Sequence, residues 1–151
     1  ENLDDVIKYE DIAAVNDSIL RIATMSEEEQ LAYFTDYTSK LKAQDLKVHI
    51  ETSGAYALTG DWDWICLSPK KMKLPTQQVY QAAHELKVII YNKNDFEFAE
   101  KQAAKVGEDC ILYLQPEWSK RETMIPQIVD YVMANPKWMV SLQTHKYLNI
   151  P

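Results

Sequence analysis

The feature that most constrains the fold is a repeated alternation between short apolar segments with strand patterning and longer segments with helical patterning. In Leu46–Ile50 the apolar side chains alternate with polar ones, and this period of two predicts a strand. Four further apolar segments predict strands at Trp62–Leu67, Glu85–Tyr91, Cys110–Gln115 and Trp138–Leu142. Strands that alternate with helices predict an α/β fold built on a mainly parallel sheet.

Two helices are predicted before the first strand. Residues Asp11–Ala23 place Ile12, Val15, Ile19 and Ile22 on one helical face. Ser26 and Glu29 form a capping-box pattern, which predicts a second helix that runs to about Ala43. We expect Leu31, Phe34 and Leu41 to face inward from that helix.

Two more helices are predicted between the later strands. The first covers Asp95–Val106, with Gly107 as its stop signal. The second covers about Thr123–Ala134, where we expect Pro126 in the first turn because proline disrupts the interior of a helix.

Charge and cysteine content narrow the class of protein. The formal net charge of −7 argues against generic nucleic-acid binding, because an acidic chain repels phosphate backbones. No apolar segment reaches the roughly 20 residues that span a bilayer, so no membrane partner is expected. Cys66 and Cys110 lie in apolar segments and are interpreted as buried free thiols, which favours a cytoplasmic location.

Polar residues follow four of the predicted strands, at 51–54, 68–70, 115–117 and 143–146. Ligands of parallel α/β folds bind at the carboxyl ends of the strands. We therefore expect these four segments to meet at one rim and to form a ligand site there.

Several common motifs are absent from the sequence. The three glycines form no phosphate-binding loop, and the position four residues after His84 is Val88 rather than a second histidine. His49, His84 and His145 lack metal-ligand spacing, so no metal site is predicted within the chain. Glu85 and Lys87 share one strand face, where either an ion pair with a neighbouring strand or a cofactor role would explain them.

Four peptides carry a resemblance to a known family. They are Val48–Gly54, Trp64–Lys70, Glu85–Ile89 and Val140–Pro151. In order and spacing they are similar to the 7-carboxy-7-deazaguanine synthases, and the terminal Gln-Thr-His-Lys-Tyr-Leu peptide is the most specific of them. The resemblance covers about residues 31–151.

The resemblance implies a radical S-adenosylmethionine enzyme with the fold of a partial (β/α) barrel. Such an enzyme cleaves S-adenosylmethionine at a [4Fe–4S] cluster, and the resulting 5′-deoxyadenosyl radical abstracts hydrogen from 6-carboxy-5,6,7,8-tetrahydropterin. Ring contraction with loss of ammonia, aided by Mg²⁺, gives 7-carboxy-7-deazaguanine for queuosine or another deazapurine. A homodimer and a reductase such as flavodoxin are also implied.

The resemblance also implies roles for single residues. The substrate-binding residues would be Thr52, His145 and Pro151, the last through a terminal carboxylate that accepts guanidine-like N–H groups. The S-adenosylmethionine site would comprise Ser53, Gly54, Ser68, Lys70 and Gln115.

The sequence departs from the family in two places. It lacks the Cys-x₃-Cys-x₂-Cys motif whose thiolates hold the cluster, and it lacks a Gly-Gly-Glu-Pro segment expected between Ala23 and Glu27. We hypothesise that residues 1–151 are the ordered part of a longer chain and form a single radical S-adenosylmethionine-like domain that is incomplete at its N-terminus. In that case Ala23 and Glu27 should lie more than about 14 Å apart, which is the reach of four peptide steps.

Two other functions remain open from the sequence. The chain could be a non-catalytic relative that keeps a pterin- or nucleoside-binding pocket without the cluster. Alternatively, Lys87 could form a Schiff base in an aldolase-like barrel, with Glu85 as its acid–base partner.

Overall fold

The computed structural model describes residues 21, 22 and 24–150, which belong to two compact units. The smaller unit contains α2 (Glu27–Lys42) and the segment Thr59–Asp61. The larger unit contains residues 47–58 and those from Trp62 onward, including the whole sheet. Most of the predicted helix Asp11–Ala23 lies outside the described residues. No helix among the described residues is both long enough and apolar enough to cross a membrane.

The predicted capping box begins α2. Glu29 N donates to Ser26 Oγ at 3.2 Å, and Ser26 N donates to Glu29 Oε2 at 2.7 Å. The inward orientation predicted for Leu31 is wrong, since 51% of this residue is exposed. Thr38 is the buried residue of α2. Phe34 and Leu41, the other two residues predicted to face inward, are half-buried.

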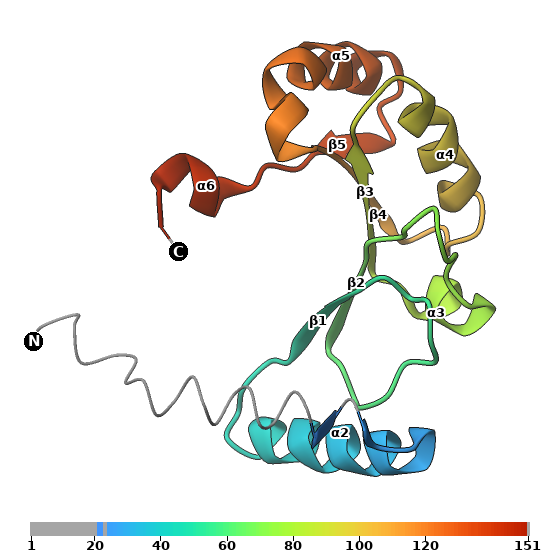
Figure 1. Cartoon of the computed structure of the whole chain (residues 1–151), viewed down its shortest axis with the longest axis vertical. Coiled ribbons are helices and arrows are strands. Elements are labelled where there is room, and N and C mark those ends of the chain that lie inside the picture. Colours follow the sequence, from blue (N-terminus) through green and yellow to red (C-terminus); the bar gives the residue numbers. More distant parts are fainter. Residues whose placement is uncertain (1–20, 23, 151) are drawn as a thin grey trace, which may run out of the picture. The chain divides into compact units, whose positions relative to one another are not determined.

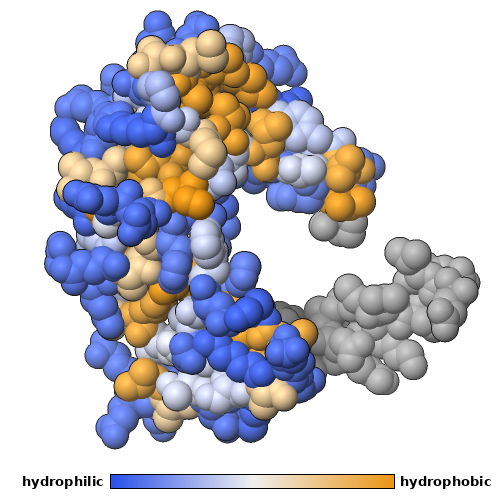
Figure 2. Space-filling model, turned by 180° about the vertical axis from the view of Figure 1, so that it is seen from behind, coloured by the Kyte–Doolittle hydropathy of each residue, from blue (hydrophilic) through white to orange (hydrophobic). Residues whose placement is uncertain are grey.

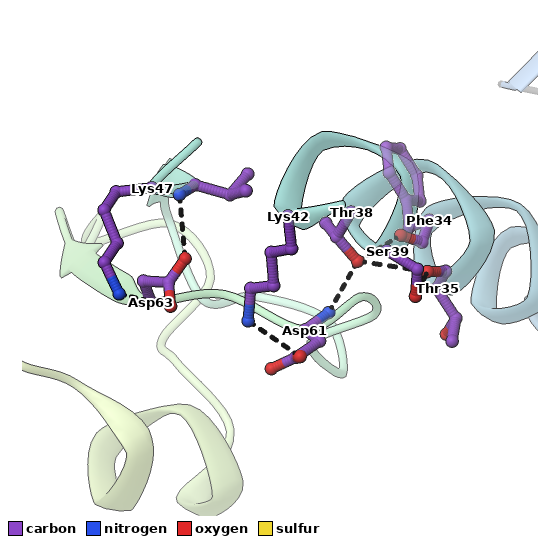
Figure 3. A network of polar contacts seen from close by, with 9 residues as sticks. Phe34, Thr35, Thr38, Ser39, Lys42, Lys47, Asp61 and Asp63 are labelled. Atoms are coloured by element: carbon purple, nitrogen blue, oxygen red, sulfur yellow. Dashed lines mark hydrogen bonds and ion pairs between the residues drawn. The ribbon is translucent and has the colours of Figure 1, made fainter. Parts of the chain in front are cut away.

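Polar contacts connect α2 to the segment Thr59–Asp61 (Figure 3). Asp61 N donates to Thr38 Oγ1 at 3.0 Å, and Lys42 Nζ pairs with Asp61 Oδ2 at 2.7 Å. Within the larger unit, Val48 N donates to Asp63 Oδ2 at 2.9 Å. This bond fixes the start of the first strand.

Hydrogen bonds join the described residues that precede α2. Met25 N donates to Ile22 O at 3.2 Å, and the side chain of Gln30 donates to both Ile22 O and Met25 O. Ala23 itself lies outside the described residues. The separation predicted between Ala23 and Glu27 therefore stays a prediction.

Five parallel strands form the sheet in the order β1-β2-β3-β4-β5. Their bounds are β1 His49–Thr52, β2 Trp64–Leu67, β3 Glu85–Ile90, β4 Ile111–Pro116 and β5 Trp138–Val140. A strand order that follows the chain without reversal is that of a barrel segment, whereas a doubly wound sheet reverses its order at a switch point. The predicted mainly parallel α/β fold is confirmed.

Helices cover one face of the sheet (Figure 1). They are α3 (Gln77–Ala82), α4 (Asn94–Ala103) and α5 (Arg121–Ala134), the last preceded by the 3₁₀ turn η2 (Trp118–Lys120). The core on this face includes Leu86, Leu114 and Trp138 from strands, packed with Val79 and Ile128 from helices. The helix-covered face of the sheet is thus apolar, as in a (β/α) barrel, where helices pack against the outside of the strands.

Two predicted helix boundaries are wrong. Helix α4 ends at Ala103, before Gly107, which does not have the positive φ of a C-terminal glycine cap. Helix α5 begins at Arg121, so Pro126 is its sixth residue rather than part of the first turn. The missing N–H of Pro126 deprives Glu122 O of its helical partner, and the exposed position of Glu122 leaves water available to that carbonyl group.

Candidate functional site at the carboxyl ends of the strands

A pocket of about 510 Å³ lies at the carboxyl ends of the strands. Glu51 enters it from β1, Lys87 and Ile89 enter it from β3, and the remaining lining comes from segments that follow β2, β4 and β5. The pocket lies on the sheet face opposite the core, because Glu51, Lys87 and Ile89 alternate with the residues that pack against the helices. Its size falls within the usual range for small-molecule sites.

Backbone hydrogen bonds continue the parallel ladders beyond the strand ends. Ser68 N donates to Thr52 O at 2.8 Å, Glu117 N donates to Ile90 O at 2.9 Å, and Ser141 N donates to Leu114 O at 2.9 Å. Pocket residues that follow β2, β4 and β5 are therefore attached to the sheet. A site supported in this way keeps its geometry better than one on free loops.

Side-chain bonds orient the polar groups of the pocket. Lys87 Nζ donates to Glu51 Oε2 at 2.7 Å, with 16% of the lysine side chain exposed. Lys70 Nζ donates to Ser68 Oγ at 3.2 Å. Ser141 Oγ donates to Gln115 Oε1 at 3.1 Å.

The charges of the pocket favour an anionic or zwitterionic ligand. Lys70, Lys87 and Lys146 bring three ammonium groups, against the carboxylates of Glu51 and Glu117. Hydrogen bonds from Ser119 hold the pKa of Glu117 below its usual range, so this group stays a carboxylate near neutral pH. A ligand carboxylate would find several charge-assisted donors here.

Four of the residues that the family resemblance singled out lie around this pocket. They are Ser68, Lys70, Gln115 and His145, which come from three different strand ends. Ser68 and Gln115 are buried, whereas Lys70 and His145 are exposed at the pocket.

The other residues singled out do not line the pocket. The hydroxyl of Thr52 accepts from Gly54 N at 3.1 Å, and Thr52 alternates with Glu51, which places it on the opposite sheet face. Ser53 is half-buried in the same turn. Gly54 has φ +70°, and a Cβ there would lie 2.7 Å from Leu67 Cδ1. Pro151 lies outside the described residues.

Close packing of Gly54 against the helix-covered face is sufficient to require a glycine. Its backbone carbonyl accepts from Thr76 N at 2.9 Å, which joins the turn to the N-terminus of α3. The roles predicted for Thr52, Ser53 and Gly54 therefore stay predictions.

A buried carboxylate outside the pocket lining had no role in the sequence-based interpretation. Asp95 is 4% exposed and accepts from Tyr91 N at 2.7 Å, from Asn92 N at 2.8 Å and from Lys71 Nζ. Burial raises the pKa of Asp95, but the hydrogen bonds from Lys71 and the backbone outweigh it and lower the pKa overall. Asp95 thereby ties the segment after β3 to the one that carries Lys70.

The cysteines of this chain do not fit a [4Fe–4S] cluster. The sequence has two, and both are buried free thiols, as predicted. Burial raises the pKa of Cys66, and it raises the pKa of Cys110 to about 11, whereas cluster ligation requires thiolates. Among the described residues, no group of three His, Cys, Asp or Glu side chains could hold a metal ion.

The charged and polar groups of the pocket match those of S-adenosylmethionine, whereas the two cysteines do not match the cluster. Lys70 offers an ammonium group for a methionine carboxylate, while Glu51 and Glu117 offer carboxylates for cationic groups. The amide of Gln115 can both donate to and accept from a nucleobase.

Fold and pocket together define a partial (β/α) barrel whose ligand site lies at the carboxyl ends of its strands. Comparisons with known proteins identify its relatives. The 7-carboxy-7-deazaguanine synthase of Flavobacterium psychrophilum is 72% identical over 117 residues, which cover 78% of this chain and 56% of that protein. The synthase of Synechocystis is 52% identical over 110 residues, covering 73% of this chain and 52% of the relative. No family model matches the chain.

A solved structure is similar to this chain in fold. The crystal structure of QueE from Escherichia coli matches with a TM-score of 0.63 and 23% identity, over 70% of this chain and 49% of that one. Over the matched residues, the chain is a homologue of the 7-carboxy-7-deazaguanine synthases, and the predicted resemblance is confirmed. The chain spans about half the length of the curated relatives it matches.

Proposed function

We propose that this chain provides part of the ligand site of a 7-carboxy-7-deazaguanine synthase, which converts 6-carboxy-5,6,7,8-tetrahydropterin to 7-carboxy-7-deazaguanine. The observation that carries the proposal is the 72% identity to such a synthase over 117 residues. The gathering of Ser68, Lys70, Gln115 and His145 around one pocket supports it.

We assign two tasks to the pocket residues. Ser68, Lys70 and Gln115 would bind S-adenosylmethionine, which supplies radical chemistry when bound. His145 would bind the pterin substrate as a hydrogen-bond donor or acceptor. Because Gln115 and Ser68 are buried and hydrogen-bonded, they present fixed groups to a ligand rather than mobile ones.

The binding proposal predicts a strong effect of Lys70. Calorimetric titration with S-adenosylmethionine should show binding to this chain, and Lys70→Met should weaken it roughly 10- to 100-fold, as expected for a charge-assisted hydrogen bond. Lys101→Met is the matched control, because Lys101 pairs only with Glu97 on the exposed side of α4 among the ion pairs of the described residues. Equal affinities for the Lys70→Met variant and the unaltered chain would refute the assignment.

The finer properties of the enzyme are also proposals. As the family resemblance implies, we infer a [4Fe–4S] cluster held by cysteines outside this sequence, a Mg²⁺ requirement, a reductase such as flavodoxin and a cytoplasmic location. A homodimer has support from the surface. Exposed apolar side chains gather over α5 and the edge strand β5 (Figure 2), among them Val129, Met133, Met139 and Val140.

A specific observation favours a second candidate, a pterin- or nucleoside-binding relative without catalysis. Neither Cys66 nor Cys110 is suited to a cluster. To distinguish the two candidates, the protein that contains this chain is treated anaerobically with iron and sulfide. Product formation supports the enzyme, while pterin binding without product supports the binding relative.

The structure disfavours a Schiff base at Lys87. Its ammonium group pairs with Glu51 at 2.7 Å, and an amine nucleophile must instead be neutral. Glu85 accepts from Trp64 Nε1 at 3.1 Å rather than from Lys87. Of the two explanations that the sequence left open for Lys87, the ion pair is the one observed, and its partner lies two strands away on β1.

A further inference from the structure

The helix α6 (Thr144–Leu148) brings His145 and Lys146 to the pocket although it has almost no support of its own. It has five residues, and none of them is buried. A helix this short is unstable in isolation, because its few hydrogen bonds do not offset the cost of starting a helix. Figure 1 shows α6 on the side of the sheet away from α3, α4 and α5. Contacts outside the core must therefore position it.

Two neighbouring side chains of α6 contact the same indole ring. The ring of Tyr147 meets Trp118 edge to face, with centroids 5.1 Å apart and planes at 81°. Lys146 Nζ lies 5.3 Å from the centroid of that ring. Edge-to-face aromatic pairs and cation–π contacts are both attractive.

Trp118 is itself attached to the sheet. The guanidinium of Arg121 lies 4.2 Å from its ring centroid, and Arg121 Nη1 donates to Trp118 O at 2.9 Å. The preceding residue, Glu117, bonds through its N–H to Ile90 O. The indole ring is therefore a fixed platform at the edge of the pocket, which Trp118 helps to line.

We propose that Trp118 and Tyr147 form a latch that holds α6 against the rim and so positions His145 at the pocket. Tyr147 is a positioning residue, since it does not line the pocket and the proposed contact with the ligand is made by His145, whereas Trp118 both lines the pocket and holds Tyr147. The identity of the ligand rests on the function proposed above, but the latch rests on the ring contacts alone.

Hydrogen exchange of the unliganded chain tests the latch. The backbone N–H groups of Lys146, Asn149 and Ile150 bond within the α6 segment, so their exchange reports its opening. Tyr147→Ala should speed their exchange about five- to tenfold, from the loss of one aromatic contact. Tyr147→Phe keeps the ring and should leave exchange unchanged. Tyr56→Ala, which removes an exposed aromatic ring after β1, is the control.

Affinity for S-adenosylmethionine and for the pterin, measured on the same variants, tests the positioning role. Tyr147→Ala should weaken binding of the pterin about three- to tenfold, because α6 must be ordered when the ligand binds, and Tyr147→Phe should restore it. Unchanged exchange in Tyr147→Ala would overturn the latch, and faster exchange with unchanged pterin affinity would overturn the positioning role. Faster exchange in a protein that binds neither ligand in any variant would leave the latch standing and refute the proposed function.

Discussion

Replacing Gly54 with alanine is expected to lower the free energy of unfolding by roughly 2–6 kcal/mol, measured by urea denaturation. A non-glycine residue at a positive φ costs about 1–3 kcal/mol, and overpacking of a tight core costs about 1–3 kcal/mol more. Both apply here, because φ is +70° and the new Cβ would lie 2.7 Å from Leu67 Cδ1 and 3.0 Å from Pro75 Cβ. A loss of this size is a large part of the total stability of a small protein.

Gly107→Ala is the matched control for this experiment. A Cβ at Gly107 meets no atom within 4 Å, and its φ is not positive. The substitution should be neutral or should stabilise by about 0.4–1 kcal/mol, because alanine restricts the unfolded chain. Equal effects of the two substitutions would contradict the packing explanation of Gly54.

Replacing Glu100 with alanine is expected to destabilise the larger unit by about 2–3 kcal/mol, as for the loss of hydrogen bonds to a charged group. The carboxylate accepts from Tyr131 Oη and Trp138 Nε1, both at 2.8 Å, and from Lys137 Nζ. Trp138 is 1% exposed, so its N–H would lose a partner in the core. We take a modest value because 34% of the Glu100 side chain is exposed.

Glu97→Ala, on the same helix, is the control for Glu100. Glu97 pairs with Lys101, and both side chains are more than half exposed. Exposed pairs of this spacing contribute about 0.3–0.5 kcal/mol. Thermal and urea denaturation should therefore separate the two variants clearly, and similar losses would show that Glu100 does not organise its surroundings.

The stabilisation from Glu100 should also depend on pH. Burial raises the pKa of Glu100, but hydrogen bonds from Lys137, Trp138 and Tyr131 outweigh it, so the pKa falls below its ordinary value of 4.5. The contribution should be complete above pH 4.5 and should decline as the pH falls through the lower, folded-state pKa. Glu100→Gln should lose this part of the pH dependence, and an unchanged acid limb of the stability profile would contradict the assignment.

Much of the fold could be predicted because its signals are local. The capping box of Ser26 and Glu29 marked the start of α2, and period-two or continuous apolar segments marked all five strands within a few residues. Helices α3 and α6 were missed because six and five residues are too few to show a helical period. Leu31 was misplaced because the apolar pattern of α2 did not show that Thr38 is its buried residue, with a hydroxyl that accepts from Asp61 N.

The position of the pocket could be predicted, but the hydrogen bonds that hold its surroundings in place could not. Polar segments after parallel strands indicated a common rim, and all four segments contribute to the pocket. The first contributes only Glu51. The supports join residues that are distant in sequence, such as Asp95 with Lys71 and Glu100 with Trp138. Trp118 gave only a weak signal, an aromatic residue within a polar segment. Gly54 looked like a ligand-facing glycine because the sequence does not show how closely Leu67 packs.

Amide chemical-shift mapping of this chain with S-adenosylmethionine tests the central claim most directly, which is that the carboxyl ends of the strands form the ligand site. We expect shifts concentrated in the pocket-lining residues that carry a backbone N–H, among them Ser68, Lys70, Gln115, Glu117, Ser141 and His145. A second pocket, at the amino ends of the strands, is lined by residues that include Gln81, His84 and Asp109. Shifts concentrated around that second pocket, with the carboxyl ends unchanged at saturating ligand, would contradict the account.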